Sequence, residues 1–477
     1  MVDRCLLEVL DCDVSIERGG GNVGSNETQG LRTAREAGWH VSRYNLYAKV
    51  PGTEKVAIAN IFKGTCAEYV PLEMYLLSTV GDLDENHPII ERFAKRGVIC
   101  NFDERAALES MGRAACASAR EIRLTICPTM GCNFDCPYCF EDHRRGEMQA
   151  EVQDDVVALA ERMINASGSK NIRVTWFGGE PLLAPRIIES LSERLLALTE
   201  EHGGTYHAGI ITNGYLLTQD IVDMLWRCKV DGCQITIDGL GSAHDATRHL
   251  AGGGATFDRI TANLRNLKIP FKVKIRHNVH EGNKEEMAEL EEFIKGIASE
   301  SGNDLFYYPA LVTGSEAADR RGEQVGLLCG SDASEVGIQL EAGRFSVGRG
   351  HFCGAHSMWS IGIDEHGNLQ KCWEATDKTR LSFGTARSWD PADPLVTATN
   401  PDNLTMLLNT ASPVPDNECR ECRWLPICVG GCPYARLFSA RSCIAFKEDE
   451  ERYVLALHAR IGEKKRLQYD TVSRWQR

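Results

Sequence analysis

Residues 122–140 read IRLTICPTMGCNFDCPYCF, a strand-like run followed closely by three cysteines. The opening letters IRLTIC are rich in β-branched residues, which is typical of a strand. Cys132, Cys136 and Cys139 follow with the spacing C-x3-C-x2-C. Three thiolates on one tight loop can hold three irons of a four-iron cluster and leave the fourth iron to an outside ligand.

A zinc site is the alternative for these cysteines. Zinc in a structural site takes four protein ligands. Cys127 and His143 lie near enough in the sequence to supply the fourth. The choice between an iron-sulfur cluster and a zinc site therefore depends on the rest of the sequence.

Strand-like and helix-like runs alternate through the middle of the chain, which indicates right-handed βαβ units and a parallel sheet. No G-x-G-x-x-G motif follows the first strand, so a barrel is favoured over a dinucleotide-binding sheet. The predicted fold class is α/β, with a partial (β/α)6 TIM-type barrel over residues 119–345. The strand candidates begin at residues 122, 172, 207, 233, 272 and 305, and the helix candidates cover 154–166, 186–201, 219–230, 256–267 and 284–298.

The regions on either side of the barrel have different compositions. Residues 1–40 contain a glycine-rich polar stretch and are expected to form a flexible lead-in. Residues 41–118 predict a strand-strand-helix-helix unit, because RYNLYAKV and KVAIANIF flank the turn sequence PGTE. Residues 346–450 read as loops rich in Cys, Gly and Pro that need an internal staple. Residues 451–477 predict a closing helix and a basic tail.

Composition excludes some partners and favours metal binding. The net charge of -14 argues against nucleic acid as a partner, because phosphate binding needs clustered Lys and Arg. The sequence has neither a long apolar run nor a signal peptide, so we expect no membrane contact and a cytoplasmic location. That compartment keeps thiols reduced, so many of the 19 cysteines are expected to bind metal rather than form disulfides.

The cysteine spacing at this position resembles the radical S-adenosylmethionine (SAM) superfamily over about residues 119–315. The resemblance implies a four-iron cluster on Cys132, Cys136 and Cys139 whose open iron binds S-adenosylmethionine. It also implies an external electron donor, such as flavodoxin or ferredoxin, and the formation of a 5′-deoxyadenosyl radical.

Further candidates for binding S-adenosylmethionine lie near the ends of the predicted strands, the face on which barrel active sites are built. The resemblance assigns the Gly178-Gly179-Glu180-Pro181 motif to the methionine amino group. Arginine fits a carboxylate with two parallel hydrogen bonds, although a surface ion pair is the alternative for each arginine. The full set of candidates is Tyr138, Gly178, Gly179, Glu180, Pro181, Thr212, Asn213, Asp238, Arg248 and Arg276.

Seven late cysteines have spacings that resemble the SPASM domain, a C-terminal domain of that superfamily. The resemblance implies two auxiliary four-iron clusters, one on Cys419, Cys422, Cys428 and Cys443, the other on Cys353, Cys372 and Cys432. The second set lacks a fourth ligand. Cys329, His356 or a substrate thiol are candidates for that position, and a double zinc ribbon is the alternative for all seven. Cys5, Cys12, Cys66, Cys100, Cys116, Cys228 and Cys233 fit neither pattern and are expected to be buried structural thiols.

SPASM relatives mostly act on peptides or proteins, so we expect a peptide or small-protein substrate. Residues 41–118 are similar to the winged-helix peptide-recognition domains of peptide maturases, although a packing or dimerisation domain is the alternative. The first hypothesis is a maturase that forms thioether cross-links from cysteine, like the maturase of a quinohemoprotein amine dehydrogenase subunit. The second is an anaerobic sulfatase-maturating enzyme that makes formylglycine, and the third is a dehydrogenase for a small molecule.

One residue is a candidate for proton transfer in this reaction. Sulfatase maturases resemble one another in having an Asp directly after the cysteine equivalent to Cys372, whereas this chain has Trp373 and then Glu374. The difference argues against formylglycine formation and leaves Glu374 as the candidate catalytic base. An electron carrier without catalysis is disfavoured, because it would not need an open cluster.

Overall fold

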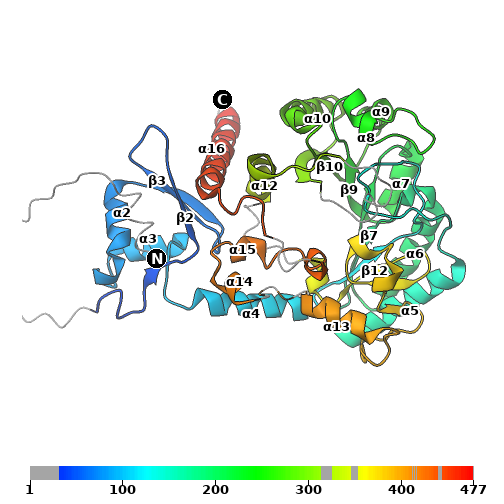
Figure 1. The fold of residues 1–477 in the computed structure, drawn as a ribbon, viewed down its shortest axis with the longest axis horizontal. Coiled ribbons are helices and arrows are strands. Elements are labelled where there is room, and N and C mark those ends of the chain that lie inside the picture. Colours follow the sequence, from blue (N-terminus) through cyan, green and yellow to red (C-terminus); the bar gives the residue numbers. More distant parts are fainter. Residues whose placement is uncertain are drawn as a thin grey trace, which may run out of the picture.

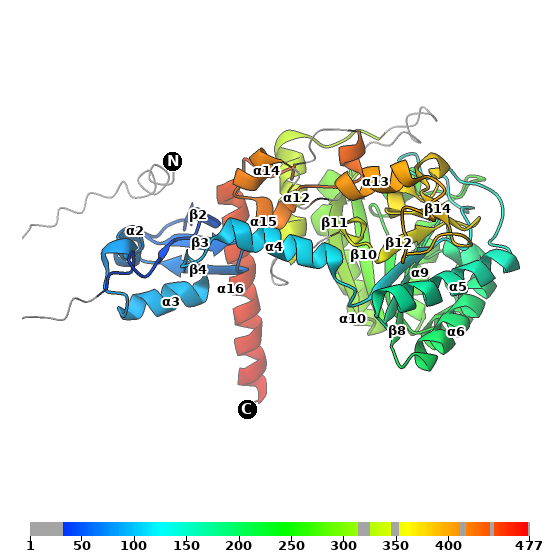
Figure 2. The same cartoon turned by 90° about the horizontal axis from the view of Figure 1, so that it is seen from below.

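The structure is a computed structural model that describes residues 32–312, 325–344, 353–410, 412, 414, 416–438 and 443–475. Figure 1 shows a small N-terminal sheet at one end, an α/β barrel at the other, and C-terminal segments between them. Figure 2 gives the same arrangement from below. The predicted lead-in falls mostly on residues 1–31, which lie outside the described residues.

A parallel sheet of six strands forms the barrel, as the alternating runs predict. Its strand order is β6-β7-β8-β9-β10-β11, and amphipathic helices pack their apolar sides against it. The prediction of an α/β partial barrel is therefore confirmed. The strands are β6 (Ile122–Ile126), β7 (Ile172–Trp176), β8 (Tyr206–Thr212), β9 (Val230–Thr236), β10 (Lys272–Val279) and β11 (Leu305–Leu311); the helices are α5 (Ala150–Ser167), α6 (Pro185–Glu201), α7 (Gln219–Arg227), α8 (Ser242–Thr247), α9 (Phe257–Asn266) and α10 (Met287–Ser301).

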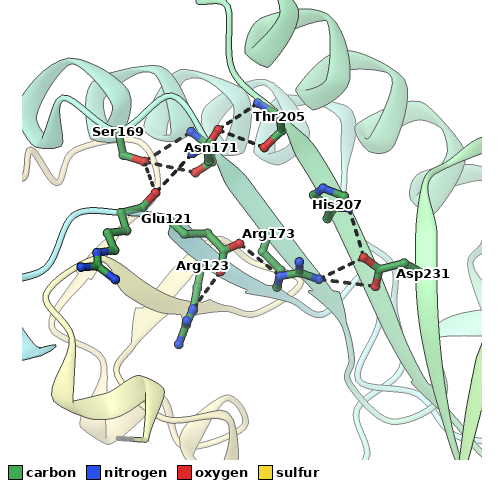
Figure 3. Close-up of polar contacts among 9 residues, drawn as sticks. Glu121, Arg123, Ser169, Asn171, Arg173, Thr205, His207 and Asp231 are labelled. Carbon is green, nitrogen blue, oxygen red and sulfur yellow. Dashed lines mark hydrogen bonds and ion pairs between the residues drawn. The ribbon is translucent and has the colours of Figure 1, made fainter.

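The amino ends of the barrel strands are joined by polar contacts, shown in Figure 3. Arg173 forms ion pairs with Glu121 at 3.2 Å and with Asp231 at 3.3 Å. His207 lies 3.1 Å from the same Asp231 carboxylate. These groups are partly exposed, so each pair contributes at most about 1 kcal/mol. They lie at the end of the barrel opposite the candidate site.

Three C-terminal strands extend the barrel sheet, which corrects the expectation that residues 346–450 form only loops. β12 (Ser360–Ile363) pairs in parallel with β6, and β13 (Asn368–Gln370) and β14 (Gly384–Thr385) continue the sheet. The Cys127 amide donates to the Ile363 carbonyl at 2.9 Å, where β6 leads into the cysteine loop. The C-terminal region therefore packs directly beside that loop.

The N-terminal unit is a three-stranded antiparallel sheet with helices on one face. The order β2-β3-β4 contains one strand more than expected, because the short run TCAEY lacks a clear strand pattern. A separate two-stranded ladder pairs β1 with β5. The elements are β1 (His40–Val41), β2 (Asn45–Lys49), β3 (Val56–Asn60), β4 (Thr65–Tyr69), α2 (Pro71–Ser78), α3 (Pro88–Arg96), β5 (Ile99–Cys100) and α4 (Glu104–Ala117).

The other face of this sheet packs on the C-terminal region. Tyr44 and Leu46 share a buried cluster with Trp424 and with Tyr453 of α16 (Glu450–Trp475). The helix continues through much of the segment expected to be a basic tail. The remaining helices are α12 (Gly330–Arg344), α13 (Pro401–Thr410), α14 (Asn417–Glu421) and α15 (Leu425–Cys428). No helix in the described ranges is long and apolar enough to cross a membrane.

The outer edge of β2 is covered by side chains of the C-terminal region. The Tyr47 amide donates to the Glu450 carboxylate at 3.0 Å. Arg423 donates to the Asn45 carbonyl at 3.2 Å and forms an ion pair with Glu450 at 2.5 Å. These groups thus occupy backbone atoms on the outer edge of β2, and β4 is the other edge strand of the sheet.

Candidate functional site

A cavity of about 260 Å³ lies at the carboxyl ends of the barrel strands, where barrel enzymes bind their ligands. Most of the predicted site residues line it. These are Cys132, Cys136, Cys139, Tyr138, Gly178, Gly179, Thr212, Asn213, Arg248, Arg276 and Glu374. Glu180, Pro181 and Asp238 are buried just behind the wall of the cavity rather than in it.

The three cysteines lie on the loop that follows β6. The Phe134 amide donates to Cys132 Sγ at 3.4 Å, and the Cys139 amide donates to the Cys136 carbonyl at 3.0 Å. Burial raises the pKa of the Cys132 thiol to about 12 and also raises that of Cys139. Thiols with a raised pKa stay protonated when no metal is bound. Metal binding requires the thiolate, so a bound metal would replace the proton.

The zinc alternative for this loop is only partly supported by the geometry. His143 Nε2 lies 3.5 Å from Cys139 Sγ, and Glu141 has a carboxylate oxygen within 4.8 Å of both ligand atoms. Cys127, however, is fully buried in a small cluster with Met130 and Phe177. The packing therefore disfavours a zinc site whose four ligands are the three loop cysteines and Cys127.

The two glycines after β7 pack directly against the cysteine loop. A Cβ atom at Gly178 would lie 2.2 Å from the Thr129 carbonyl oxygen, and one at Gly179 would lie 2.3 Å from that of Gly131. Both distances are far below van der Waals contact, so only glycine fits. The two glycines therefore hold the cysteine loop over the strand ends, a structural role that was not predicted from the sequence.

Glu180 joins the same loop to the next strand. Its amide donates to the Gly131 carbonyl at 2.8 Å. Its carboxylate accepts from the Thr212 hydroxyl at 2.7 Å, the Asn213 amide at 2.7 Å and the Leu182 amide at 3.0 Å. Burial raises the pKa of Glu180 while these hydrogen bonds lower it. The carboxylate thus fixes β8 beside β7.

A buried polar network surrounds Tyr138. Its hydroxyl donates to the Asp238 carboxylate and accepts from Arg248 at 2.9 Å and from the Asn278 side chain at 3.2 Å. The backbone amide of Asn278 donates to the Asp238 carboxylate at 2.8 Å. Asp238 therefore orients the tyrosine and does not itself face the cavity.

Arg248 is a buried arginine whose side-chain hydrogen-bond donors are not all paired within the described residues. It is only 8% exposed, which excludes the surface ion pair considered from the sequence. Its Nε atom has no hydrogen-bond partner among the described residues, and its guanidinium lies 5.6 Å from the Phe134 ring centroid. A buried, unsatisfied guanidinium is costly unless a ligand completes its bonds. The cavity therefore fits a ligand with a carboxylate, as S-adenosylmethionine has.

Arg276 and Glu374 also line the cavity and come from different regions of the chain. Arg276 Nε donates to Asn278 Oδ1 at 2.6 Å. Glu374 extends from the 3-10 turn Trp373–Ala375 of the C-terminal region. Burial raises the pKa of its carboxyl group, while Arg276 and Lys378 lower it. The C-terminal region thus contributes an ionisable side chain to the barrel cavity.

The four cysteines of the complete C-terminal set line one small cavity. Cys353, Cys372 and Cys432 also lie near one another. Burial raises the pKa of the Cys372 thiol, and Cys353 and Cys432 add to the effect through their charge. His356 is buried in the turn after Cys353, whereas Cys329 is exposed at the start of α12. Of the two predicted protein candidates for the fourth ligand, His356 lies beside Cys353, because its amide donates to the Cys353 carbonyl at 3.0 Å.

A second cavity of about 930 Å³ opens between β11, α10, α12 and α16. It shares Gln234 and Trp373 with the first cavity. The Trp373 side chain is 47% exposed and lies 5.9 Å from the Phe177 ring. Tyr308, in the second cavity, donates a hydrogen bond to Gln234 at 2.5 Å. The two cavities are therefore neighbours that share part of their walls.

Sequence reasoning missed several residues of the site. Gln234 and Thr236 on β9 and Asn278 on β10 line the first cavity. Positions two apart on a strand share a face, so the period of β9 was an available signal for its two residues. Asn278 is recognisable only from its bonds to Tyr138 and Asp238, which are distant in the sequence.

Residues 126–294 match the model of the Radical SAM superfamily. Pre-heme d1 synthase of Dinoroseobacter shibae is 27% identical over 225 residues, or 47% of this chain and 51% of that protein. AdoMet-dependent heme synthase of Methanosarcina barkeri is 30% identical over 38% of this chain and 49% of that protein. The chain thus spans about half the length of these curated relatives.

Other similarities extend beyond the barrel. A cysteine-type anaerobic sulfatase-maturating enzyme of Clostridium perfringens is 23% identical over 67% of this chain and 89% of that protein. The solved structure of anSMEcpe with bound AdoMet has a TM-score of 0.55 at 18% identity, covering 72% of this chain and 98% of that chain. The structure with AdoMet and the Cp18Cys peptide has a TM-score of 0.53 at 19% identity, covering 71% and 96%. At these identities the structural matches show a common fold.

Adding a methyl group at Gly179 should displace the cysteine loop. Because the new Cβ atom would meet backbone rather than a flexible side chain, the loop itself has to move. We expect Gly179→Ala to lose about one four-iron cluster from the reconstituted protein, measured as iron per chain. Gly252→Ala is the matched control, since nothing lies within 4 Å of a Cβ atom there. Equal iron in the two variants would contradict the role given to Gly179.

Proposed function

We propose that this chain, whose residues 126–294 match the Radical SAM superfamily, is a peptide maturase of that superfamily that forms thioether cross-links from cysteine. The observation that carries the proposal is the junction of two cavities at Gln234 and Trp373. The smaller cavity suits a cosubstrate beside the cysteine loop, and the larger one has room for several residues of a peptide. A small-molecule substrate would not need the larger space.

We assign three clusters to the cysteines. The Cys132, Cys136 and Cys139 thiolates would hold the cluster beside the cavity and leave one iron for S-adenosylmethionine. Cys419, Cys422, Cys428 and Cys443, which line one small cavity, would hold a complete second cluster. Cys353, Cys372 and Cys432 would hold the third, with His356 or a substrate thiol as its fourth ligand. The open position on this third cluster is the reason for preferring a reaction at cysteine sulfur.

The residues around the cavity would bind and orient S-adenosylmethionine. Arg248 would take its carboxylate, because its buried guanidinium lacks a partner at Nε. Thr212 and Asn213 at the end of β8 and the Tyr138 ring would contact the remaining polar and aromatic parts. In this superfamily the reduced cluster and bound cosubstrate supply a 5′-deoxyadenosyl radical that removes a hydrogen atom from the substrate. The protein's part is to exclude water and fix the geometry.

We propose Glu374 as the group that accepts the proton from the substrate. It lines the cavity, it is half-buried, and it comes from the segment that carries Cys372. An oxidised product also requires an electron acceptor, which is the role proposed for the C-terminal clusters. The first cluster would be reduced by an external donor such as flavodoxin or ferredoxin, in keeping with a cytoplasmic enzyme.

Formylglycine formation in a sulfatase is the second candidate function. The 364-residue similarity to the Clostridium perfringens enzyme favours it. Trp373 stands where we expect an Asp in enzymes of that type, which favours cross-linking instead. The two reactions give different products from cysteine, so product analysis separates them.

Replacing Arg248 should weaken binding of S-adenosylmethionine. Arg248→Lys keeps the positive charge but loses the paired donors, so we expect the Kd of the reconstituted protein to rise about tenfold. Equilibrium dialysis under anaerobic conditions measures it. Arg259→Lys is the control, because Arg259 is exposed on α9. An unchanged Kd in Arg248→Lys would rule out the carboxylate contact.

The N-terminal sheet is proposed to recognise the substrate peptide by adding it as a strand beside β4. The opposite edge, β2, is already covered by Glu450 and Arg423. A peptide pairing with β4 would protect its amides from hydrogen exchange. With a synthetic precursor peptide from a neighbouring reading frame, exchange should slow in residues 65–69 and stay constant in 45–49. Slowing in neither segment, or only in 45–49, would refute this docking site.

The decisive experiment is mass spectrometry of the peptide after anaerobic turnover. Full-length reconstituted enzyme, S-adenosylmethionine, a chemical reductant and the cysteine-containing precursor peptide are combined. We expect the peptide to lose two hydrogen atoms and one cysteine to become inaccessible to alkylation. Glu374→Gln should still release 5′-deoxyadenosine but give little cross-linked peptide. Conversion of cysteine to an aldehyde would instead establish the formylglycine reaction.

A further inference from the structure

Three potential metal ligands meet in the N-terminal unit, far in sequence from the seven C-terminal cysteines. His40 on β1 and Cys100 on β5 are directly opposite each other in the antiparallel ladder. Glu104 begins α4 four positions after Cys100. One ligand atom from each residue lies within 4.8 Å of the other two. Cys100 is thus an exception among the thiols that fit no cluster pattern.

The imidazole of His40 is oriented as metal ligands usually are. Its Nδ1 atom lies 2.9 Å from the Gly38 carbonyl oxygen, which can only accept, so Nδ1 carries the proton. The lone pair of Nε2 therefore points toward Cys100 Sγ at 3.3 Å. A ring nitrogen fixed by a backbone carbonyl is the arrangement that orients histidine for a metal.

Glu104 is held just as firmly. Its side chain accepts from the Ser42 hydroxyl at 2.6 Å and from the Arg43 amide at 2.9 Å. The residue is 4% exposed and Cys100 is 5% exposed. Burial, together with the Glu104 charge, raises the pKa of the Cys100 thiol to about 12. A carboxylate and a thiol buried side by side suit a divalent cation, which would stabilise both as anions.

We propose that His40, Cys100 and Glu104 bind a zinc ion. In a tetrahedral zinc site the sulfur and nitrogen ligands lie about 3.5 Å apart, close to the separation of Cys100 Sγ and His40 Nε2. A Glu104 carboxylate oxygen lies within 4.8 Å of both of these atoms and supplies the third ligand. His40 is exposed, so a water molecule completes the fourth position. One sulfur, one nitrogen and one oxygen ligand favour zinc over magnesium or calcium.

The zinc ion would stabilise the surface of the N-terminal unit that contacts the segment carrying Cys419 and Cys422. Arg43, whose amide donates to Glu104, also donates from its side chain to Glu421 at 3.1 Å. Arg105, next to Glu104, forms an ion pair with the same glutamate. Glu421 lies between Cys419 and Cys422. The ion thus ties β1 and β5 to the start of α4, where the N-terminal unit contacts the proposed second cluster.

The test is the zinc content of reconstituted enzyme after incubation with zinc sulfate and removal of loose metal. Wild type and Cys228→Ala should each retain about one zinc ion more per chain than Cys100→Ala and His40→Ala. Cys228 is the matched control, because it is also 5% exposed and lies on the barrel. Iron per chain should be equal in all four proteins, which shows that the clusters and the fold are intact.

X-ray absorption at the zinc edge identifies the ligands independently of stoichiometry. We expect one sulfur and otherwise nitrogen or oxygen neighbours. Equal zinc in all four proteins, no retained zinc in wild type, or a shell of three or four sulfurs would each overturn the proposal. A sulfur-rich shell would mean that zinc occupies the cluster cysteines. Because His40 is exposed, His40→Ala leaves the core unchanged and keeps the test valid if Cys100→Ala folds poorly.

Discussion

The backbone contact between the Gly178-Gly179 turn and the cysteine loop determines the geometry of the site. There is no space for a side chain between the two segments, and the Glu180 amide fixes their separation with a bond to Gly131. The Glu180 carboxylate extends the same connection to Thr212 and Asn213 on the next strand. Through its carboxylate and its amide, Glu180 thus joins the ends of β7 and β8 to the loop above them. The shape of the cavity therefore depends on how these strand ends and the cysteine loop are held together.

The C-terminal region completes the site through contacts of a different kind. β12 pairs with β6, so the strand that leads into the cysteine loop has sheet partners on both sides. Glu374 then enters the cavity from that region, and Trp373 lies where the two cavities join. α16 and Arg423 link the same region to the N-terminal sheet. The β4 edge, where we propose that the peptide binds, and the cavity in the barrel are thereby parts of one packed structure.

Local patterns predicted the barrel strands and helices, because their hydrophobic periods are long and regular. The resemblance to the radical SAM superfamily supplied about half of the residues that line the cavity, and these come together because parallel strands bring their carboxyl ends to one face. Local patterns did not predict β12, whose four residues form a strand by pairing with β6 and β13. Likewise, the roles of Glu180 and Asp238 depend on partners far away in the sequence. Sequence spacing identified the residue types, but packing decided which of them face the cavity.

The central claim is that the ten cysteines form three separate cluster sites, of which the Cys132 site alone serves the cosubstrate. Iron analysis of the reconstituted protein tests it most directly. We predict about twelve iron atoms per chain in wild type and about eight when Cys132, Cys136 and Cys139 are all replaced by alanine. About four iron atoms in wild type, lost entirely in the triple variant, would contradict the account.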